Sequence, residues 1–153
     1  MPALLTMWAD RLPSFAAAVV TSSDLTQPYV YEQLPAVPEQ AAVARGHLAR
    51  WAGGIGLSEN LAQDIVLASG EAISNAIEHA YIGIDGDVTI FAGTTSPGDA
   101  IRVIVTDTGR WRPPESSPGL RGRGWGMLER LTETFRLAHT PDGTTVVLRW
   151  SRH

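Results

Sequence analysis

A carboxylate and a carboxamide lie four residues apart in the segment 71–81, which reads Glu-Ala-Ile-Ser-Asn-Ala-Ile-Glu-His-Ala-Tyr. Apolar residues recur around them at helical spacing, so Glu71 and Asn75 are expected to project from one face of a helix, one turn apart. The Glu71 carboxylate can take a proton from an attacking hydroxyl. The Asn75 carboxamide offers Mg2+ an oxygen without adding charge next to a phosphate. The alternative is a solvated Glu and an incidental Asn on an amphipathic helix.

A second candidate group follows a predicted strand. Apolar residues dominate 101–105, as is typical of a largely buried strand, and the chain then runs into Asp107 and Gly109. The Asp107 carboxylate can accept a hydrogen bond from an amino group such as that of adenine, and Gly109 lets a flat ring approach the backbone. Because Asp and Gly are common turn residues, a plain turn at the strand end is the alternative.

A glycine-rich segment precedes a third helical pattern. Gly122 and Gly124 alternate with other residues just before apolar residues recur at helical spacing. Glycine-rich backbone leading into a helix N-terminus can bind an anion through free N–H groups and the helix dipole. Arg121 and Arg123 add positive charge for phosphate oxygens, unless they are solvated loop charges. The spacing matches neither the dinucleotide fingerprint nor a P-loop.

The elements that position these residues follow from periodicity and chain breakers. The expected strands are 29–34, 87–94, 100–106, 135–139 and 144–150, and the expected helices are 39–52, 58–81 and 126–134. Pro38 opens the first of these helices and Ser58 caps the second. This order predicts the α/β class, as an α+β two-layer sandwich with one mixed, mostly antiparallel sheet and helices on one face. His79, near the end of the second helix, is expected to be a packed or capping side chain.

Two parts of the chain are expected from its composition. Prolines and a Thr-Ser-Ser cluster in residues 1–28 indicate a loosely ordered extension or linker, or an extra docking helix. The remaining residues 29–153 are long enough for one domain with its own core.

The charge balance and residue types exclude several function classes. The net charge of −4 argues against direct nucleic-acid binding, which needs a basic surface. The chain has no cysteine, so disulfides and thiol catalysis are excluded. It has no apolar run long enough to span a membrane and no secretory signal, so the expected location is the cytoplasm, without a membrane partner.

Four motifs in a fixed order carry the most specific signal. E-x-x-x-N on a helix is followed by D-x-G after a strand, G-x-G before a helix, and G-T-T-V before the last strand. This series resembles the Bergerat-fold (GHKL) ATP-binding superfamily of gyrase, Hsp90, histidine kinases and MutL, and the resemblance covers roughly residues 28–150. Within the superfamily the short chain is similar to the bacterial anti-sigma factor serine kinases, and the D-T-G-R-W-R-P-P segment to their actinobacterial members.

The resemblance implies ATP and Mg2+ as ligands and assigns roles by motif. It implies that Glu71 is the general base for a substrate serine, that Asn75 is a Mg2+ ligand, and that Asp107 accepts the adenine amino group. The further nucleotide-binding residues that it implies are Gly109 under the base, Thr144 or Thr145 near the same ring edge, and Gly122, Gly124, Arg121 and Arg123 around the phosphates.

The implied function is that of an ATP-dependent serine/threonine kinase. Such a kinase phosphorylates a STAS-type anti-anti-sigma factor and also binds a sigma factor. One alternative is a non-catalytic ATP-dependent switch that holds a partner, and another is an ATPase domain cut from a larger sigma-factor regulator. The sequence leaves dimerisation open, although related kinases are usually homodimers.

Overall fold

The computed structural model describes residues 2–79, 86–95, 98–109, 126–140 and 143–152 of the 153-residue chain. The helices are α1 (Ala3–Asp10), α2 (Ser14–Thr21), α3 (Pro38–Gly54) and α4 (Glu59–His79). The strands are β1 (Val30–Pro35), β2 (Asp87–Thr94), β3 (Ala100–Asp107), β4 (Thr134–Thr140) and β5 (Gly143–Ser151). A further helical turn and a half spans 126–131.

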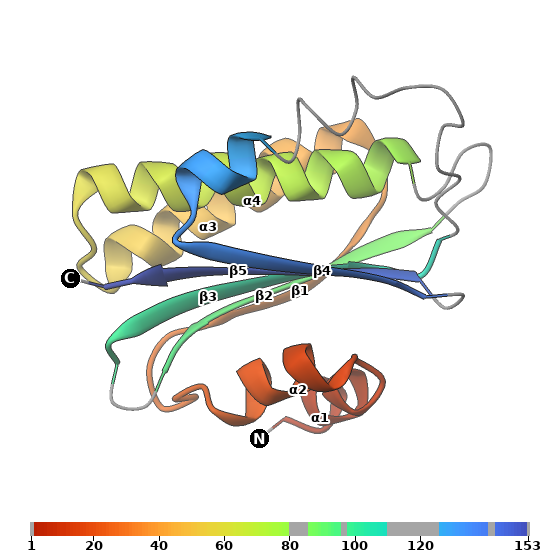
Figure 1. Ribbon diagram of the computed structural model, residues 1–153, viewed down its shortest axis with the longest axis horizontal. Helices are drawn as coiled ribbons and strands as arrows, with labels where there is room; N and C mark the ends of the chain where they lie inside the picture. Colours follow the sequence, from red (N-terminus) through yellow and green to blue (C-terminus); the bar gives the residue numbers. More distant parts are fainter. Residues whose placement is uncertain (1, 80–85, 96–97, 110–125, 141–142, 153) are drawn as a thin grey trace.

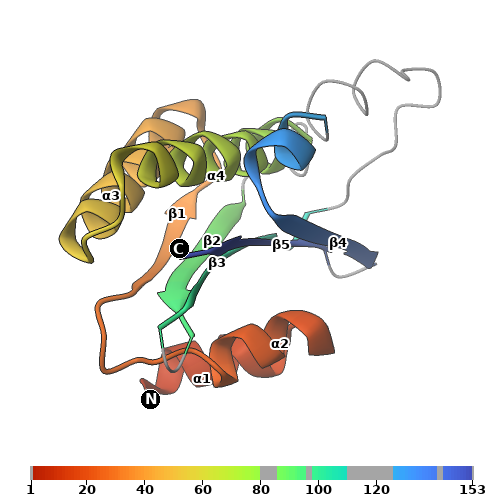
Figure 2. The ribbon, with the colours of Figure 1, turned by 60° about the vertical axis from the view of Figure 1, so that its left-hand side comes forward.

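The five strands form one sheet in the order β1-β2-β3-β5-β4 (Figure 1). The predicted α/β sandwich is confirmed, with two differences. The sheet is not mixed, because each of the pairings β1–β2, β2–β3, β3–β5 and β4–β5 is antiparallel. The expectation of helices on one face was also wrong, because α1 and α2 lie on the face opposite α3 and α4 (Figures 1 and 2).

Strand alternation divides the buried side chains between two cores. On the α3–α4 face, β2, β3 and β5 contribute Val88, Ile90, Val103, Val105, Val146 and Leu148 to the larger core. The residues between them, Phe91, Ile104 and Val147, point to the other face and pack with α1 and α2. Successive residues of β3 and β5 therefore serve different cores, which explains why these central strands are apolar almost throughout.

The predicted start of α4 is confirmed by its cap. Ser58 Oγ accepts a hydrogen bond from the backbone N–H of Leu61 at 3.2 Å, which satisfies one of the free donors of the first turn. Pro38 lies in the first turn of α3, where its missing N–H costs no helical bond.

The helix predicted at 126–134 ends at residue 131. The chain turns there, and the backbone N–H of Glu133 donates a hydrogen bond to the carbonyl oxygen of Arg149 in β5.

The N-terminal residues, expected to form a loose extension or a docking helix, form two packed helices. Leu5 of α1 and Ala16 of α2 are fully buried against the sheet. Arg102 of β3 donates from Nη1 to Ser22 Oγ at 2.7 Å and from Nη2 to the carbonyl oxygen of Val19 at 3.1 Å, which ties down the end of α2. Burial lowers the pKa of the Arg102 guanidinium. The domain boundary near residue 28 stays a prediction.

No helix in the described part of the chain is both long and apolar enough to cross a membrane.

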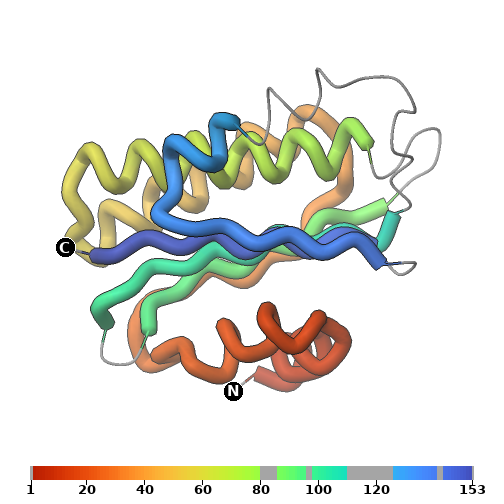
Figure 3. The backbone as a smooth tube through the Cα atoms, viewed as in Figure 1, coloured from red at the N-terminus to blue at the C-terminus, as the bar shows by residue number. Residues whose placement is uncertain are grey.

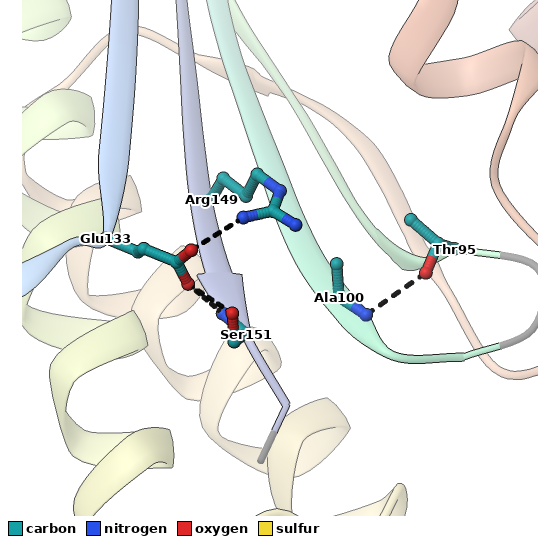
Figure 4. Close-up of polar contacts among 5 residues, drawn as sticks. All are labelled: Thr95, Ala100, Glu133, Arg149 and Ser151. Atoms are coloured by element: carbon teal, nitrogen blue, oxygen red, sulfur yellow. Dashed lines mark hydrogen bonds and ion pairs between the residues drawn. The ribbon is translucent and has the colours of Figure 1, made fainter.

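An acidic side chain ties β4 to the end of β5 (Figure 4). The Glu133 carboxylate accepts hydrogen bonds from Arg149 Nη1 at 2.9 Å, from the backbone N–H of Ser151 at 2.7 Å, and from the Ser151 hydroxyl. The hydrogen bonds from Ser151, together with the charge of Arg149, lower the pKa of the Glu133 carboxyl below its ordinary value of 4.5. The carboxylate therefore stabilises the fold while it is ionised.

Replacing Glu133 with Gln is expected to lower the melting temperature at pH 7 but not in acid. A group whose pKa is lower in the folded state contributes its stability above its unfolded pKa and loses it as the pH falls through its folded pKa. The difference from wild type should therefore shrink as the pH drops below 4.5. Thermal melts followed by circular dichroism across this window test it, with exposed Glu129→Gln as control. Equal melting temperatures of wild type and Glu133→Gln at pH 7 would contradict it.

Candidate functional site

One edge of the sheet gathers the polar residues singled out in the sequence. β3 ends and β5 begins at this edge, and the C-terminal end of α4 lies above it (Figure 3). Asp107, the last residue of β3, pairs with Thr144 near the start of β5. The α4 end and the two strand ends thus surround one corner of the sandwich.

Asp107 is a buried carboxylate on the α4 side of the sheet. It follows Val103 and Val105 at two-residue spacing, so its side chain points to the same core as theirs. The side chain is 5% exposed, and its Oδ1 accepts the backbone N–H of Gly109 at 3.1 Å. A carboxylate has a second oxygen, which can accept a hydrogen bond from an amino group brought into this corner.

Thr144 and Thr145 lie on opposite faces of β5. Thr144 is paired with Asp107, precedes Val146 by two residues, and shares the α4 face, where its Oγ1 lies 2.9 Å from His139 Nδ1 of β4. Thr145 is paired with Thr106 and shares the face of α1 and α2. The sequence left open which threonine stands beside the carboxylate, and strand alternation assigns that position to Thr144. The involvement of Thr145 in nucleotide binding stays a prediction.

Glu71 and Asn75 lie on α4, half-buried and beside its buried stripe. Helical spacing puts them on the flank opposite Gly70. Gly70 faces α3, because a Cβ added there would lie 2.8 Å from Cδ of Arg45. The flank with Glu71 and Asn75 is therefore the one away from α3, where the 126–131 helix lies next to α4 (Figure 2). Within the described residues, neither side chain has a hydrogen-bond partner.

His79 lies one turn beyond Asn75, near the end of α4. Its side chain is one-fifth exposed and its Nε2 lies 3.7 Å from Glu78 Oε2. This is the packed position expected of a structural histidine.

Gly143 allows β5 to approach the end of β3. Its φ is +140°, and a Cβ at this position would lie 1.9 Å from the carbonyl oxygen of Asp107. The glycine of G-T-T-V is thus required by the backbone contact that brings Thr144 beside Asp107.

Replacing Gly143 with Ala is expected to destabilise the fold by about 2–4 kcal/mol, because the methyl group forces the ends of β3 and β5 apart. Urea unfolding followed by fluorescence measures this loss. Gly53→Ala is the matched control, because a Cβ on this α3 glycine meets nothing within 4 Å. That substitution should stabilise slightly through helix propensity. Equal destabilisation by both substitutions, or none by either, contradicts the expected contact.

Arg121, Gly122, Arg123 and Gly124 lie outside the described residues, so their phosphate-binding role stays a prediction. The helix that follows them, 126–131, is anchored by Leu128, which is fully buried in the larger core.

The donor and acceptor groups of this corner fit an adenine nucleotide. A buried carboxylate suits the 6-amino group of adenine, and a threonine hydroxyl beside it can donate to or accept from the same ring edge. No group of three or more His, Cys, Asp or Glu that could hold a metal ion occurs in the described parts of the chain. The Asn75 carboxamide oxygen is a neutral oxygen donor of the kind that can ligate Mg2+ beside phosphate oxygens and water, and its role as a Mg2+ ligand stays a prediction.

Residues 34–150 match the family of histidine kinase-like ATPase domains. The matched range contains the last two residues of β1, the whole of α3, α4, β2, β3 and β4, and all of β5 except its last residue. The chain belongs to the histidine kinase-like ATPase family. The N-terminal helices α1 and α2 lie outside the matched range.

Named relatives within the family are serine-protein kinases. The serine-protein kinase RsbW of Oceanobacillus iheyensis is 32% identical over 125 residues, which cover 71% of this chain and 78% of that protein. RsbW of Listeria monocytogenes (strain HCC23) is 39% identical over 132 residues, covering 76% and 82% of the two chains. The resemblance to the anti-sigma factor serine kinases is thereby confirmed.

A solved structure also resembles this fold. The RsbU and RsbW domains of Rv1364c from Mycobacterium tuberculosis superpose with a TM-score of 0.67 at 29% identity over 81% of this chain. This chain spans about a third of that protein, 32% of its length.

Proposed function

We propose that this protein is an ATP-dependent serine kinase that binds ATP and Mg2+ at the corner formed by α4 and the ends of β3 and β5. The observation that carries the proposal is the buried Asp107 carboxylate beside Thr144, on the same face of the sheet as the helix with Glu71 and Asn75. Membership of the ATPase family and the kinase names of its relatives support it.

The proposed roles follow from the chemistry of each group. Asp107 accepts the adenine amino group, and Asn75 offers its carboxamide oxygen to Mg2+ near the phosphates. Bound Mg2+ would neutralise charge on the phosphate oxygens. Glu71 takes the proton of the substrate serine hydroxyl as the serine oxygen bonds to the γ-phosphorus. The bond from that phosphorus to the β–γ bridging oxygen breaks, and ADP leaves.

The partner class is part of the same proposal. A serine in a STAS-type anti-anti-sigma protein is the proposed acceptor, and a sigma factor is the proposed second partner. The relatives named as serine-protein kinases support a protein substrate. The net charge of −4 disfavours direct contact with nucleic acid, which fits a regulator that acts through proteins in the cytoplasm.

One alternative is favoured by a specific observation. The solved relative joins an RsbU and an RsbW domain in one chain, and this chain covers only the smaller share of it. A role as the ATPase part of a larger regulator is accordingly one alternative. A non-catalytic ATP-dependent switch is the other alternative, and it differs from the kinase only in lacking phosphate transfer.

Phosphate transfer to a protein tests the proposal. The purified chain is first titrated with ATP and Mg2+ by calorimetry, with Asn75→Ala beside wild type. It is then incubated with γ-labelled ATP and each STAS-domain protein encoded in the same genome. Label on a STAS protein, lost when its acceptor serine is changed to Ala, is the expected result. Nucleotide binding without transfer to any of them would favour the switch, and no binding at millimolar ATP would overturn the proposal altogether.

A further inference from the structure

The N-terminal helix α1 touches the strand that carries Asp107, from the opposite face of the sheet. Trp8 Nε1 donates a hydrogen bond to Thr106 Oγ1 at 3.2 Å. The indole is 8% exposed, and its ring centroid lies 5.4 Å from that of Tyr31 and 6.4 Å from that of Phe91. Its position is therefore fixed by packing as well as by the hydrogen bond.

Thr106 and Asp107 are consecutive residues at the end of β3. Their side chains point to opposite faces, so Trp8 holds the strand end from below while Asp107 faces the corner above. Both residues pair with β5, Thr106 with Thr145 and Asp107 with Thr144. A tilt or shift of this strand end would move the Asp107 carboxylate and the hydroxyl beside it together.

The rest of the helix pair is anchored further along the sheet. Arg102, four residues before Thr106 in β3, binds the end of α2 through Ser22 Oγ and the carbonyl oxygen of Val19. The guanidinium of Arg136 in β4 lies 4.4 Å from the ring centroid of Phe15 in α2. These two contacts hold α2, and α1 packs with α2 in the same core. The indole of Trp8 is therefore presented to β3 by a docked helix pair.

We propose that Trp8 is a positioning residue for adenine recognition, so that docking of α1 under β3 and nucleotide binding at Asp107 strengthen each other. The proposal rests on the nucleotide binding proposed above. It concerns helices outside the range that matches the ATPase family. Energetic coupling between two sites is reciprocal, so it has two independent readouts: α1 variants weaken nucleotide binding, and nucleotide protects α1.

The first readout is the affinity for ADP with Mg2+, measured by calorimetry on the full chain. Trp8→Phe keeps a buried ring but removes the N–H donor, and Thr106→Val removes the acceptor at similar volume. Each is expected to weaken ADP binding about threefold to tenfold, because the free energy of this one hydrogen bond sets the most that its loss can transmit to the nucleotide site. The double variant should lose no more than either single variant, because both remove the same bond.

The matched control is Trp51→Phe. Trp51 is also buried and donates from Nε1, to the carbonyl oxygen of Pro28 at 2.9 Å, far from the Asp107 end of β3. It should lower the melting temperature like Trp8→Phe but leave ADP affinity unchanged. If Trp8→Phe and Thr106→Val behave as this control does, Trp8 is only structural and the proposal is overturned.

The second readout is amide hydrogen exchange with and without ADP and Mg2+. The expected result is slower exchange in residues 3–10 on binding, in addition to protection near Asp107. Protection confined to α4, β3 and β5 would overturn the coupling while leaving the nucleotide site intact. If the wild-type protein binds no ADP, both this inference and the proposed function are overturned. Failure of the coupling alone can therefore be told apart from failure of the nucleotide site.

Discussion

Replacing Glu71 with Gln is expected to lower phosphate transfer about 10²–10⁴-fold, the usual contribution of a general base. Gln has nearly the same shape, so the half-buried position on α4 should be kept while the proton acceptor is lost. The affinity for ATP with Mg2+ should change less than about twofold, because the role of Glu71 is proton transfer and not binding. Labelled-phosphate transfer and calorimetry on the same preparation measure both quantities.

Glu59→Gln is the control for this prediction. Glu59 is the exposed first residue of α4, at the helix end away from the corner, so the substitution removes the same charge from the same helix outside the corner. Transfer by this variant should stay close to wild type. A Glu71→Gln protein that transfers phosphate at the wild-type rate would remove Glu71 from the mechanism, and one that fails to bind ATP would make it a binding residue.

Replacing Asp107 with Asn is expected to weaken ADP binding about 10- to 150-fold, the factor for roughly 1.5–3 kcal/mol lost with a charged hydrogen bond. The amide oxygen can keep the bond from the N–H of Gly109, which Oδ1 now accepts. The amide NH2 then faces the 6-amino group of adenine. Both groups are hydrogen-bond donors, whereas the wild-type carboxylate is an acceptor. Inosine diphosphate, with a carbonyl in place of the amino group, should lose much less affinity.

The comparison of the two nucleotides makes this prediction specific to base recognition. Asp99→Asn is its control, because Asp99 lies at the other end of the sheet, where its Oδ1 accepts the hydroxyl of Thr95 at 2.7 Å (Figure 4 shows Thr95). That variant should bind both nucleotides as wild type does. Equal losses for ADP and inosine diphosphate in Asp107→Asn would mean that Asp107 supports the fold of the corner without reading the base.

Much of the site was predictable because its signals are local. Helical periodicity depends on neighbouring residues alone, so the spacing of Glu71 and Asn75 predicted a shared helix face, and α4 has that face. The strand 87–94 was predicted with the bounds observed for β2, because Gly and Pro mark the turns on both sides of it. The start of α4 followed from Ser58, a capping residue that acts within one turn.

The second face of the sheet was harder to foresee. Apolar residues fill both alternating sets in β3 and β5, which shows that both faces are buried but not what covers them. The cover proved to be α1 and α2, whose prolines and small residues suggested a loose segment. Their helices are stabilised by docking, through contacts such as that of Arg102 with Ser22, which are 80 residues apart in the chain.

The amino-acid sequence by itself determined which chemical groups are present and which element carries each one. It placed Glu71 and Asn75 on one helix face and Asp107 at the end of a buried strand, because helical and strand periodicity depend only on residues a few positions apart. Only the tertiary structure decided which groups meet. The pairing of Asp107 with Thr144, the close approach of Gly143 and the contact of Trp8 with Thr106 depend on strand register and helix docking between distant segments. Register is set by how whole strands and faces pack together, and short-range periodicity does not specify it.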